Sequence, residues 1–103
     1  MVKDKPVQDD LTLKDLKKAG LTNKIKAITT GTDTPGMDWN LVSKDFKANF
    51  NLTTLVIAKG MGYYETLSEE LVKDKIFYLL MAKCKPIARS LGVPLNSYIA
   101  MFQ

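Results

Sequence analysis

Short apolar runs alternate with amphipathic helical patterns along this sequence, and polar, glycine-containing turns separate them. The apolar runs predict strands at residues 25–30, 54–58, 76–82 and 97–102. A weaker strand pattern at residues 2–8 is interrupted by Pro6, which suits the end of a strand better than its middle. The run at residues 54–58 is apolar on both sides, as is typical of a central strand in a parallel sheet that helices cover on both faces.

Two capping-box patterns indicate where helices begin. Thr12 and Asp15 predict a short helix that Gly20 ends. Thr66 and Glu69 form the second candidate, after a polar turn.

Two further helices are expected from periodicity and from proline placement. Four apolar residues recur at helical spacing and predict a helix over about residues 39–49 with one buried face: Trp39, Val42, Phe46 and Phe50. Pro86 suits the first turn of a short helix that ends before Gly92, with Ile87 and Leu91 on its buried side.

This alternation predicts an α/β fold, specifically a Rossmann-like three-layer αβα sandwich with a mostly parallel sheet of about four to five strands. The 103 residues suit one domain, and no linker divides them. The longest apolar run, at residues 76–82, is about a third of the roughly 20 residues that cross a bilayer, and no signal peptide is recognisable. We therefore expect one α/β domain over residues 1–103, cytoplasmic and without a membrane partner.

The composition excludes several kinds of site. Cys84 is the only cysteine and histidine is absent, so the chain cannot form an internal disulfide or the common zinc and copper ligand sets. Ser-His-Asp and Cys-His nucleophilic sites are excluded for the same reason. Any bound metal is expected to be a hard ion with oxygen ligands.

The net charge of +4 does not predict a nucleic-acid partner. Fourteen of the fifteen cationic residues are lysines interleaved with acids, and Arg89 is the single arginine able to read a base with a bidentate contact. A solvated, mildly basic surface accounts for this pattern.

Charged residues follow three of the predicted strands, where open α/β sheets bind their ligands. Asp9 and Asp10 follow the first strand, Asp33 follows the second, and Lys59 follows the third together with Gly60 and a second glycine two residues on. Carboxylates suit Mg²⁺ or Mn²⁺, and a lysine beside glycines suits a phosphate, because backbone amides can then approach the anion. The pattern therefore indicates phosphate handling.

Structural explanations remain open for each of these residues. Adjacent aspartates are common turn formers and helix N-terminal charges, and a lysine after a strand is often only a solvated strand end. Cys84, between two lysines near a helix start, is best explained by packing. The glycines match neither the dinucleotide-binding nor the P-loop spacing, so NAD and ATP chemistry gain no support.

Residues 5–13, KPVQDDLTL, resemble the Pro-hydrophobic-x-Asn-Asp-Ala-Thr segment of the metal-dependent damage-control phosphatases, a family formerly known as a domain of unknown function. Three further stretches resemble the family in the same order, at residues 30–36 with 41–43, at 57–67 and at 80–92. The resemblance covers almost the whole chain and is strongest to the stand-alone archaeal branch.

The resemblance implies a divalent-metal-dependent phosphatase acting on small phosphorylated metabolites such as sugar phosphates. The metal (Mn²⁺, Ni²⁺, Co²⁺ or Mg²⁺) would be held by an Asp-Asn pair after one strand and by an aspartate after the next, which Asp10 matches. By the same likeness Asp10 and Lys59 are catalytic, and Lys59 holds the substrate phosphate. The implied substrate-binding residues are Lys59, Gly60, Gly62, Tyr63, Glu65 and Asp33.

The chain departs from the family pattern in three ways. Tyr63 stands where relatives often have asparagine, Asp9 replaces the asparagine of the first motif, and no Asp-Asn dipeptide occurs. We therefore expect the carboxy-terminal portion of a larger phosphatase domain, a poor enzyme by itself, that self-associates or associates with a missing N-terminal segment. The alternative is a non-catalytic α/β module that binds phosphate or a partner.

Overall fold

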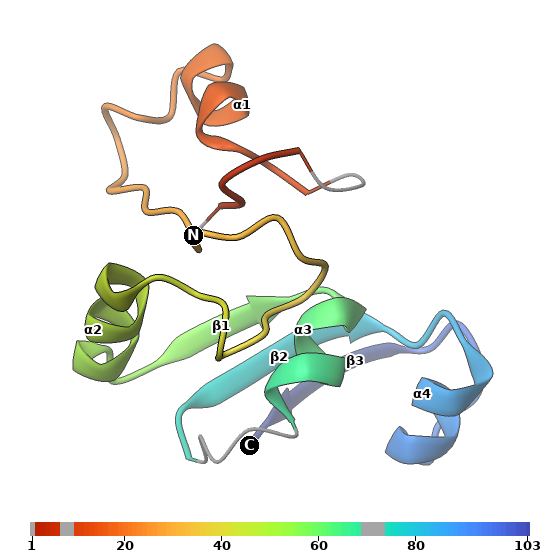
Figure 1. The fold of residues 1–103 in the computed structure, drawn as a ribbon. Coiled ribbons are helices and arrows are strands. Elements are labelled where there is room, and N and C mark those ends of the chain that lie inside the picture. The colour runs from red at the N-terminus through yellow and green to blue at the C-terminus, as the bar shows by residue number, and fades with distance from the viewer. Residues whose placement is uncertain (1, 7–9, 69–73) are drawn as a thin grey trace. The chain divides into compact units, whose positions relative to one another are not determined.

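The computed structural model describes residues 2–6, 10–68 and 74–103. The chain forms two compact units, Met1–Leu52 and Thr53–Gln103, and each is described by itself (Figure 1). That residues 1–103 make up a single domain stays a prediction. No helix among the described residues is long and apolar enough to cross a membrane.

The first helix of the Met1–Leu52 unit, α1 (Leu13–Lys18), begins and ends where the sequence predicts. The Asp15 carboxylate accepts hydrogen bonds from the backbone N–H and the hydroxyl of Thr12, both at 2.8 Å, which satisfies the start of the helix. Gly20 follows the helix in the left-handed conformation (φ +69°), and its N–H donates to the Lys17 carbonyl.

The strands predicted at residues 2–8 and 25–30 are reduced to isolated bridges, Val2 with Thr29 and Lys3 with Thr12, both parallel. Val2 donates to the Ile28 carbonyl and accepts from Thr30, at 2.9 and 3.0 Å, and the Asp4 N–H donates to the Thr32 carbonyl at 3.3 Å. Among the described residues these contacts do not form a regular ladder. The Ile25 side chain is 53% exposed, so this run lacks the buried face that would hold a longer strand. Residues 7–9 lie outside the described part.

The second helix, α2 (Lys44–Leu52), begins five residues later than predicted. Asp38 holds a separate turn before it, because its carboxylate accepts from the Asn40 N–H at 2.9 Å. Ser43 then caps the helix, since its hydroxyl accepts from the Phe46 N–H at 3.1 Å. The predicted helical face is confirmed only for Phe46 and Phe50, because Trp39 and Val42 precede α2. Val42 is nevertheless buried with them, and Trp39 packs edge-on against Phe50 at 5.1 Å.

The Thr53–Gln103 unit contains a three-stranded mixed sheet of order β1-β2-β3, formed by β1 (Val56–Lys59), β2 (Ile76–Met81) and β3 (Tyr98–Phe102). β1 and β2 are parallel, whereas β2 and β3 are antiparallel. The α/β class is confirmed, but the described sheet is smaller and less parallel than predicted. The strand predicted to be central lies at the edge of this sheet, and β2 occupies the centre.

Two short helices accompany the sheet. α3 (Met61–Leu67) packs on β1 and β2, and α4 (Lys85–Leu91) follows β2 (Figure 1). α4 has its proline in the first turn and Gly92 in the left-handed conformation after its last turn, as predicted. Thr66 does not begin a helix: it lies in the last turn of α3 and donates to the Gly62 carbonyl, and Glu69 lies outside the described residues.

The antiparallel return of β3 follows from the shortness of α4. Seven helical residues span about 10 Å, whereas the six residues of β2 span about 20 Å, so α4 cannot carry the chain back along the sheet. The ends of the connection meet instead, because Ala82 donates to the Ser97 carbonyl and Asn96 donates to the Ala82 carbonyl. This pairing reverses the chain beside β2.

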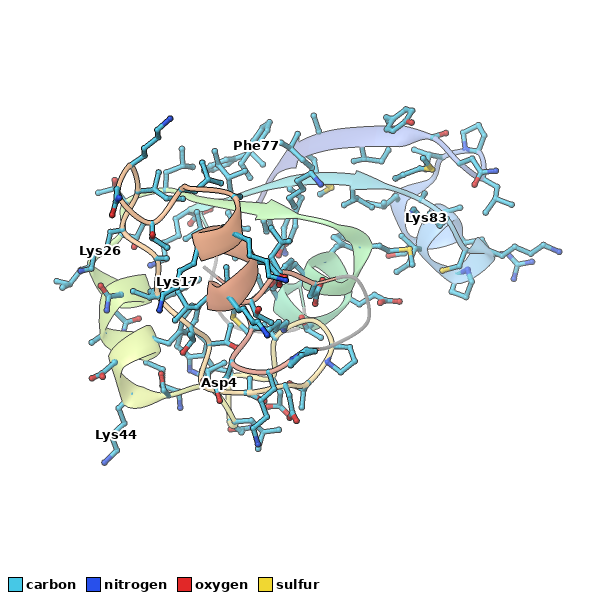
Figure 2. All side chains as sticks on the ribbon, turned by 90° about the horizontal axis from the view of Figure 1, so that it is seen from above. Asp4, Lys17, Lys26, Lys44, Phe77 and Lys83 are labelled. Atoms are coloured by element: carbon cyan, nitrogen blue, oxygen red, sulfur yellow. The ribbon has the colours of Figure 1, made fainter. Side chains whose placement is uncertain are left out.

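The two faces of the sheet differ in exposure. On the face that carries Ile76, Tyr78 and Leu80 these side chains are buried, and Tyr64 of α3 packs edge-on against Tyr78 at 5.5 Å. The opposite face, here called the open face, consists by strand register of Ile57, Lys59, Phe77, Leu79, Met81, Tyr98, Ala100 and Phe102. Figure 2 shows Phe77 on the side of the sheet that faces away from α3.

Candidate functional site

The site residues predicted from the sequence fall into both units. Asp10 and Asp33 belong to the Met1–Leu52 unit, whereas Lys59 to Glu65 belong to the Thr53–Gln103 unit. The structure therefore presents two groups of candidates, one per unit.

A buried lysine organises the first group, and sequence reasoning missed it because it assigned the lysines to the solvated surface. Lys3 is 1% exposed, and its Nζ donates to the Thr34 carbonyl at 2.7 Å and to the Gly36 carbonyl. Burial lowers the pKa of Lys3, and the charge of Asp10 opposes that shift. The sequence signal that could have indicated the burial of Lys3 was its position next to Val2 in the short strand pattern of residues 2–8.

The loop that Lys3 holds carries Asp33. Thr30 donates to the Thr32 carbonyl at 3.0 Å, and the Thr34 N–H donates to the Thr32 hydroxyl at 3.2 Å. Gly31 adopts a left-handed conformation (φ +74°), and a Cβ there would lie 2.7 Å from the Cβ of Ser43. The loop is thus fixed by close packing and by its own hydrogen bonds, while the Asp33 side chain is exposed.

Asp10 lies on the same backbone pairing as Lys3. The Lys3 N–H donates to the Leu11 carbonyl at 2.9 Å, so Asp10 directly precedes a hydrogen-bonded position, and its side chain is exposed. A carboxylate in this place can supply one or two oxygen ligands to a metal. No group of three or more Asp, Glu, His or Cys side chains that could hold a metal occurs among the residues that the structure describes, and Asp9 falls outside them.

Lys59 is the last residue of β1, and its side chain is exposed. Gly60 follows with φ +110°, a conformation that favours glycine, and its N–H donates to the Leu79 carbonyl of β2 at 2.8 Å. The Gly60 amide is thus hydrogen-bonded within the sheet, and the expectation that a backbone amide beside Lys59 approaches an anion stays a prediction.

Residues 61–67 form α3, a helix that the sequence patterns did not predict. Tyr64, which sequence reasoning did not single out, anchors this helix: it is buried and its hydroxyl lies 3.1 Å from that of Ser90. Glu65 is exposed and Tyr63 is half-buried on the same helix. The three-residue spacing of Tyr64 and Leu67, both buried, was the available helical signal.

Cys84 precedes α4 as its N-cap residue and is half-buried. Its thiol lies 3.8 Å from the Met61 sulfur. This contact with the half-buried Met61 agrees with a packing role for Cys84.

The described structure thus defines an α/β chain with a carboxylate beside a short parallel pairing and a lysine at the end of a strand. Residues 1–99 match the damage-control phosphatase ARMT1-like domain. The chain belongs to this family.

Three archaeal proteins are among its relatives. The chain is 46% identical to the damage-control phosphatase of Pyrococcus horikoshii over 99 residues, 41% identical to an uncharacterised protein of Methanocaldococcus jannaschii over 103, and 32% identical to a damage-control phosphatase of Archaeoglobus fulgidus over 102. These alignments cover 96%, 98% and 97% of the chain. They cover 34%, 34% and 35% of the relatives, so the chain spans about a third of their length.

The fold resembles that of a solved relative. The crystal structure of a DUF89 family protein from Pyrococcus horikoshii matches 98% of this chain with a TM-score of 0.91 and 44% identity, and the match covers 35% of that protein. The family resemblance read from the four motifs is confirmed.

Proposed function

We propose that this chain forms part of a divalent-metal-dependent phosphatase that hydrolyses small phosphorylated metabolites, such as sugar phosphates. The observation that carries the proposal is the family match over residues 1–99, which includes both Asp10 and Lys59. Two of its relatives are named damage-control phosphatases. The proposed substrates follow from that family and from the strand-end charges.

Lys59 and Asp10 have different proposed roles. Lys59 is exposed at the end of a strand, where its ammonium group can pair with the phosphate oxygens of a substrate. Asp10 contributes one ligand to the metal. The organic part of the substrate would be bordered by Asp33, Gly60, Gly62, Tyr63 and Glu65.

The described residues do not fit a complete metal centre, because one candidate carboxylate is too few for stable oxygen coordination of Mn²⁺, Ni²⁺, Co²⁺ or Mg²⁺. The remaining ligands therefore have to come from outside the described residues. We expect the isolated chain to show no Mn²⁺-stimulated hydrolysis of fructose 1-phosphate above a buffer blank. Clear turnover that Asp10→Ala abolishes would contradict this expectation.

The fold, the cellular location and the partners proposed from the sequence fit this function. In the intact domain the three strands would belong to a Rossmann-like three-layer αβα sandwich with a mostly parallel sheet of about four to five strands. The support is β2, which carries apolar side chains on both faces. A cytoplasmic location and the absence of nucleic-acid and membrane partners remain part of the proposal.

A non-catalytic module that binds phosphate or a partner is the second candidate, because no three-ligand metal group occurs in the described part of the chain. An NMR titration with inorganic phosphate, and then with Mn²⁺, separates the two. The phosphatase proposal predicts paramagnetic broadening centred on Asp10, and Asp10→Asn should remove it while Asp38→Asn should not. Metal-independent shifts confined to Gly60 and α3, without broadening at Asp10, would favour the binding module.

A further inference from the structure

The backbone of Lys3 is paired with the stretch that contains Asp10. Its N–H donates to the Leu11 carbonyl at 2.9 Å, and a parallel bridge joins Lys3 to Thr12, whose backbone is extended. Paired residues of neighbouring extended segments project to the same side, and so do residues two apart within one segment. This pairing therefore places the side chains of Lys3, Thr12 and Asp10 on one side.

The side chain of Lys3 connects this pairing to the loop that contains Asp33. Its Nζ donates to the Thr34 carbonyl at 2.7 Å and to the Gly36 carbonyl, and the side chain is 1% exposed. A lysine loses much of its rotamer freedom and its hydration on burial, so hydrogen bonds and charge must hold it in place. Lys3 thus links the two stretches that supply Asp10 and Asp33.

The carbonyls that Lys3 binds are neutral, so they do not balance its charge. Burial lowers the pKa of Lys3, and the negative charge of Asp10 acts in the opposite direction because it favours the charged ammonium group. The Asp10 side chain itself is exposed, and such side chains usually exchange between staggered rotamers. A fixed ammonium group on the same side favours the rotamer that brings the carboxylate nearest to it.

We propose that Lys3 is a positioning residue, which holds the Asp10 carboxylate in one rotamer and the turn at residues 34–36 in one conformation. The importance of Asp10 rests on the proposed function, and this inference adds the residue that presents it. A carboxylate already held in one orientation loses less conformational entropy when it binds its ligand. Lys3 acts through Asp10 and through the loop.

The test is NMR of the full 103-residue chain without metal or phosphate. The three-bond couplings of the Asp10 β-protons should fit a single staggered rotamer. Lys3→Met keeps an unbranched side chain but removes the ammonium group, so these couplings should become averaged over several rotamers, and exchange of the Thr34 amide proton should become at least about tenfold faster. Lys5→Met is the matched control: Lys5 is exposed, and losing its charge should change neither measurement.

A second measurement needs no variant and so does not depend on how Lys3→Met folds. Nuclear Overhauser effects between the Lys3 ε-protons and the Asp10 β-protons should be present in the unmodified chain. Their absence, or an Asp10 that already samples several rotamers, would overturn the proposal.

Two outcomes for the variants would also overturn it. If Lys3→Met loosens the loop while Asp10 keeps a single rotamer, Lys3 only supports the loop. If Lys5→Met averages the Asp10 couplings equally, the effect belongs to net charge and not to Lys3. Because these measurements involve no metal, their failure is distinct from failure of the metal titration.

Discussion

At the residue scale, the side chains that shape the candidate site are mostly ones whose burial the sequence does not reveal. Lys3 stands among fourteen lysines that look alike in sequence, but it is buried and binds two loop carbonyls. A buried ammonium group is retained when hydrogen bonds offset its loss of water. Lys3 therefore fixes the loop that carries Asp33.

Replacing Lys3 by methionine should destabilise the Met1–Leu52 unit by about 1–3 kcal/mol, because the Thr34 and Gly36 carbonyls lose their buried donor. Urea unfolding measures the change. The control is Lys5→Met, since Lys5 is exposed and its replacement should leave the unfolding free energy nearly unchanged. Equal effects of the two substitutions would contradict the role of Lys3.

Tyr78 is the second informative residue, because its buried hydroxyl has no hydrogen-bond partner among the described residues. Tyr78→Phe should raise the free energy of unfolding by up to about 1 kcal/mol, since an unsatisfied buried hydroxyl is removed while the ring stays. Tyr98→Phe, at a position 83% exposed, should have no such effect. A clear loss of stability in Tyr78→Phe would show that the hydroxyl is bonded.

The buried hydroxyl of Tyr78 should also make the free energy of unfolding depend on pH. Burial raises the pKa of Tyr78 above its ordinary value of 10.0, with a smaller contribution from Tyr64. The unfolded chain then loses the proton first, so Tyr78 lowers the free energy of unfolding as the pH rises above about 10. Urea titrations from pH 8 to 11 should show a smaller alkaline loss of stability in Tyr78→Phe than in the unmodified chain.

At the scale of elements, the starts and ends of helices depend on local side chains, whereas strand pairing depends on the rest of the fold. Thr12 with Asp15, and Gly92 after α4, act where their sequence patterns predict. The predicted start of α2 was five residues too early. The Asp38 carboxylate accepts from the Asn40 N–H in a separate turn, and the Ser43 hydroxyl caps the helix at the Phe46 N–H. Apolar periodicity does not reveal such side-chain hydrogen bonds to the backbone.

Gly31 offers a test of how tightly the loop packs before α2. Gly31→Ala should destabilise the chain more than Gly20→Ala, although both residues have similar positive φ values of 74° and 69°. The difference arises because a Cβ at Gly31 would meet Ser43 at 2.7 Å, while nothing lies within 4 Å of one at Gly20. We expect an excess of about 1–3 kcal/mol in urea unfolding. Equal losses of stability in the two variants would mean that Ser43 can move away from the new Cβ without destabilising the chain.

At the scale of the whole molecule, the chain spans about a third of the length of its relatives. The described residues include one candidate metal ligand with no group of three, and one face of the sheet is apolar and exposed. Under the proposed function, further polypeptide would supply the remaining metal ligands.

The sequence by itself determined the α/β class, the family and the sites of α1 and α4, because these depend on local periodicity, capping residues and ordered motifs. It also singled out Asp10 and Lys59. Only the tertiary structure decided that β3 runs antiparallel, that β1 lies at the edge of the described sheet, that the Gly60 amide serves β2 and that Lys3 is buried. Each of these depends on contacts between residues distant in sequence, and local patterns do not encode which partner a strand end or a buried cation will meet.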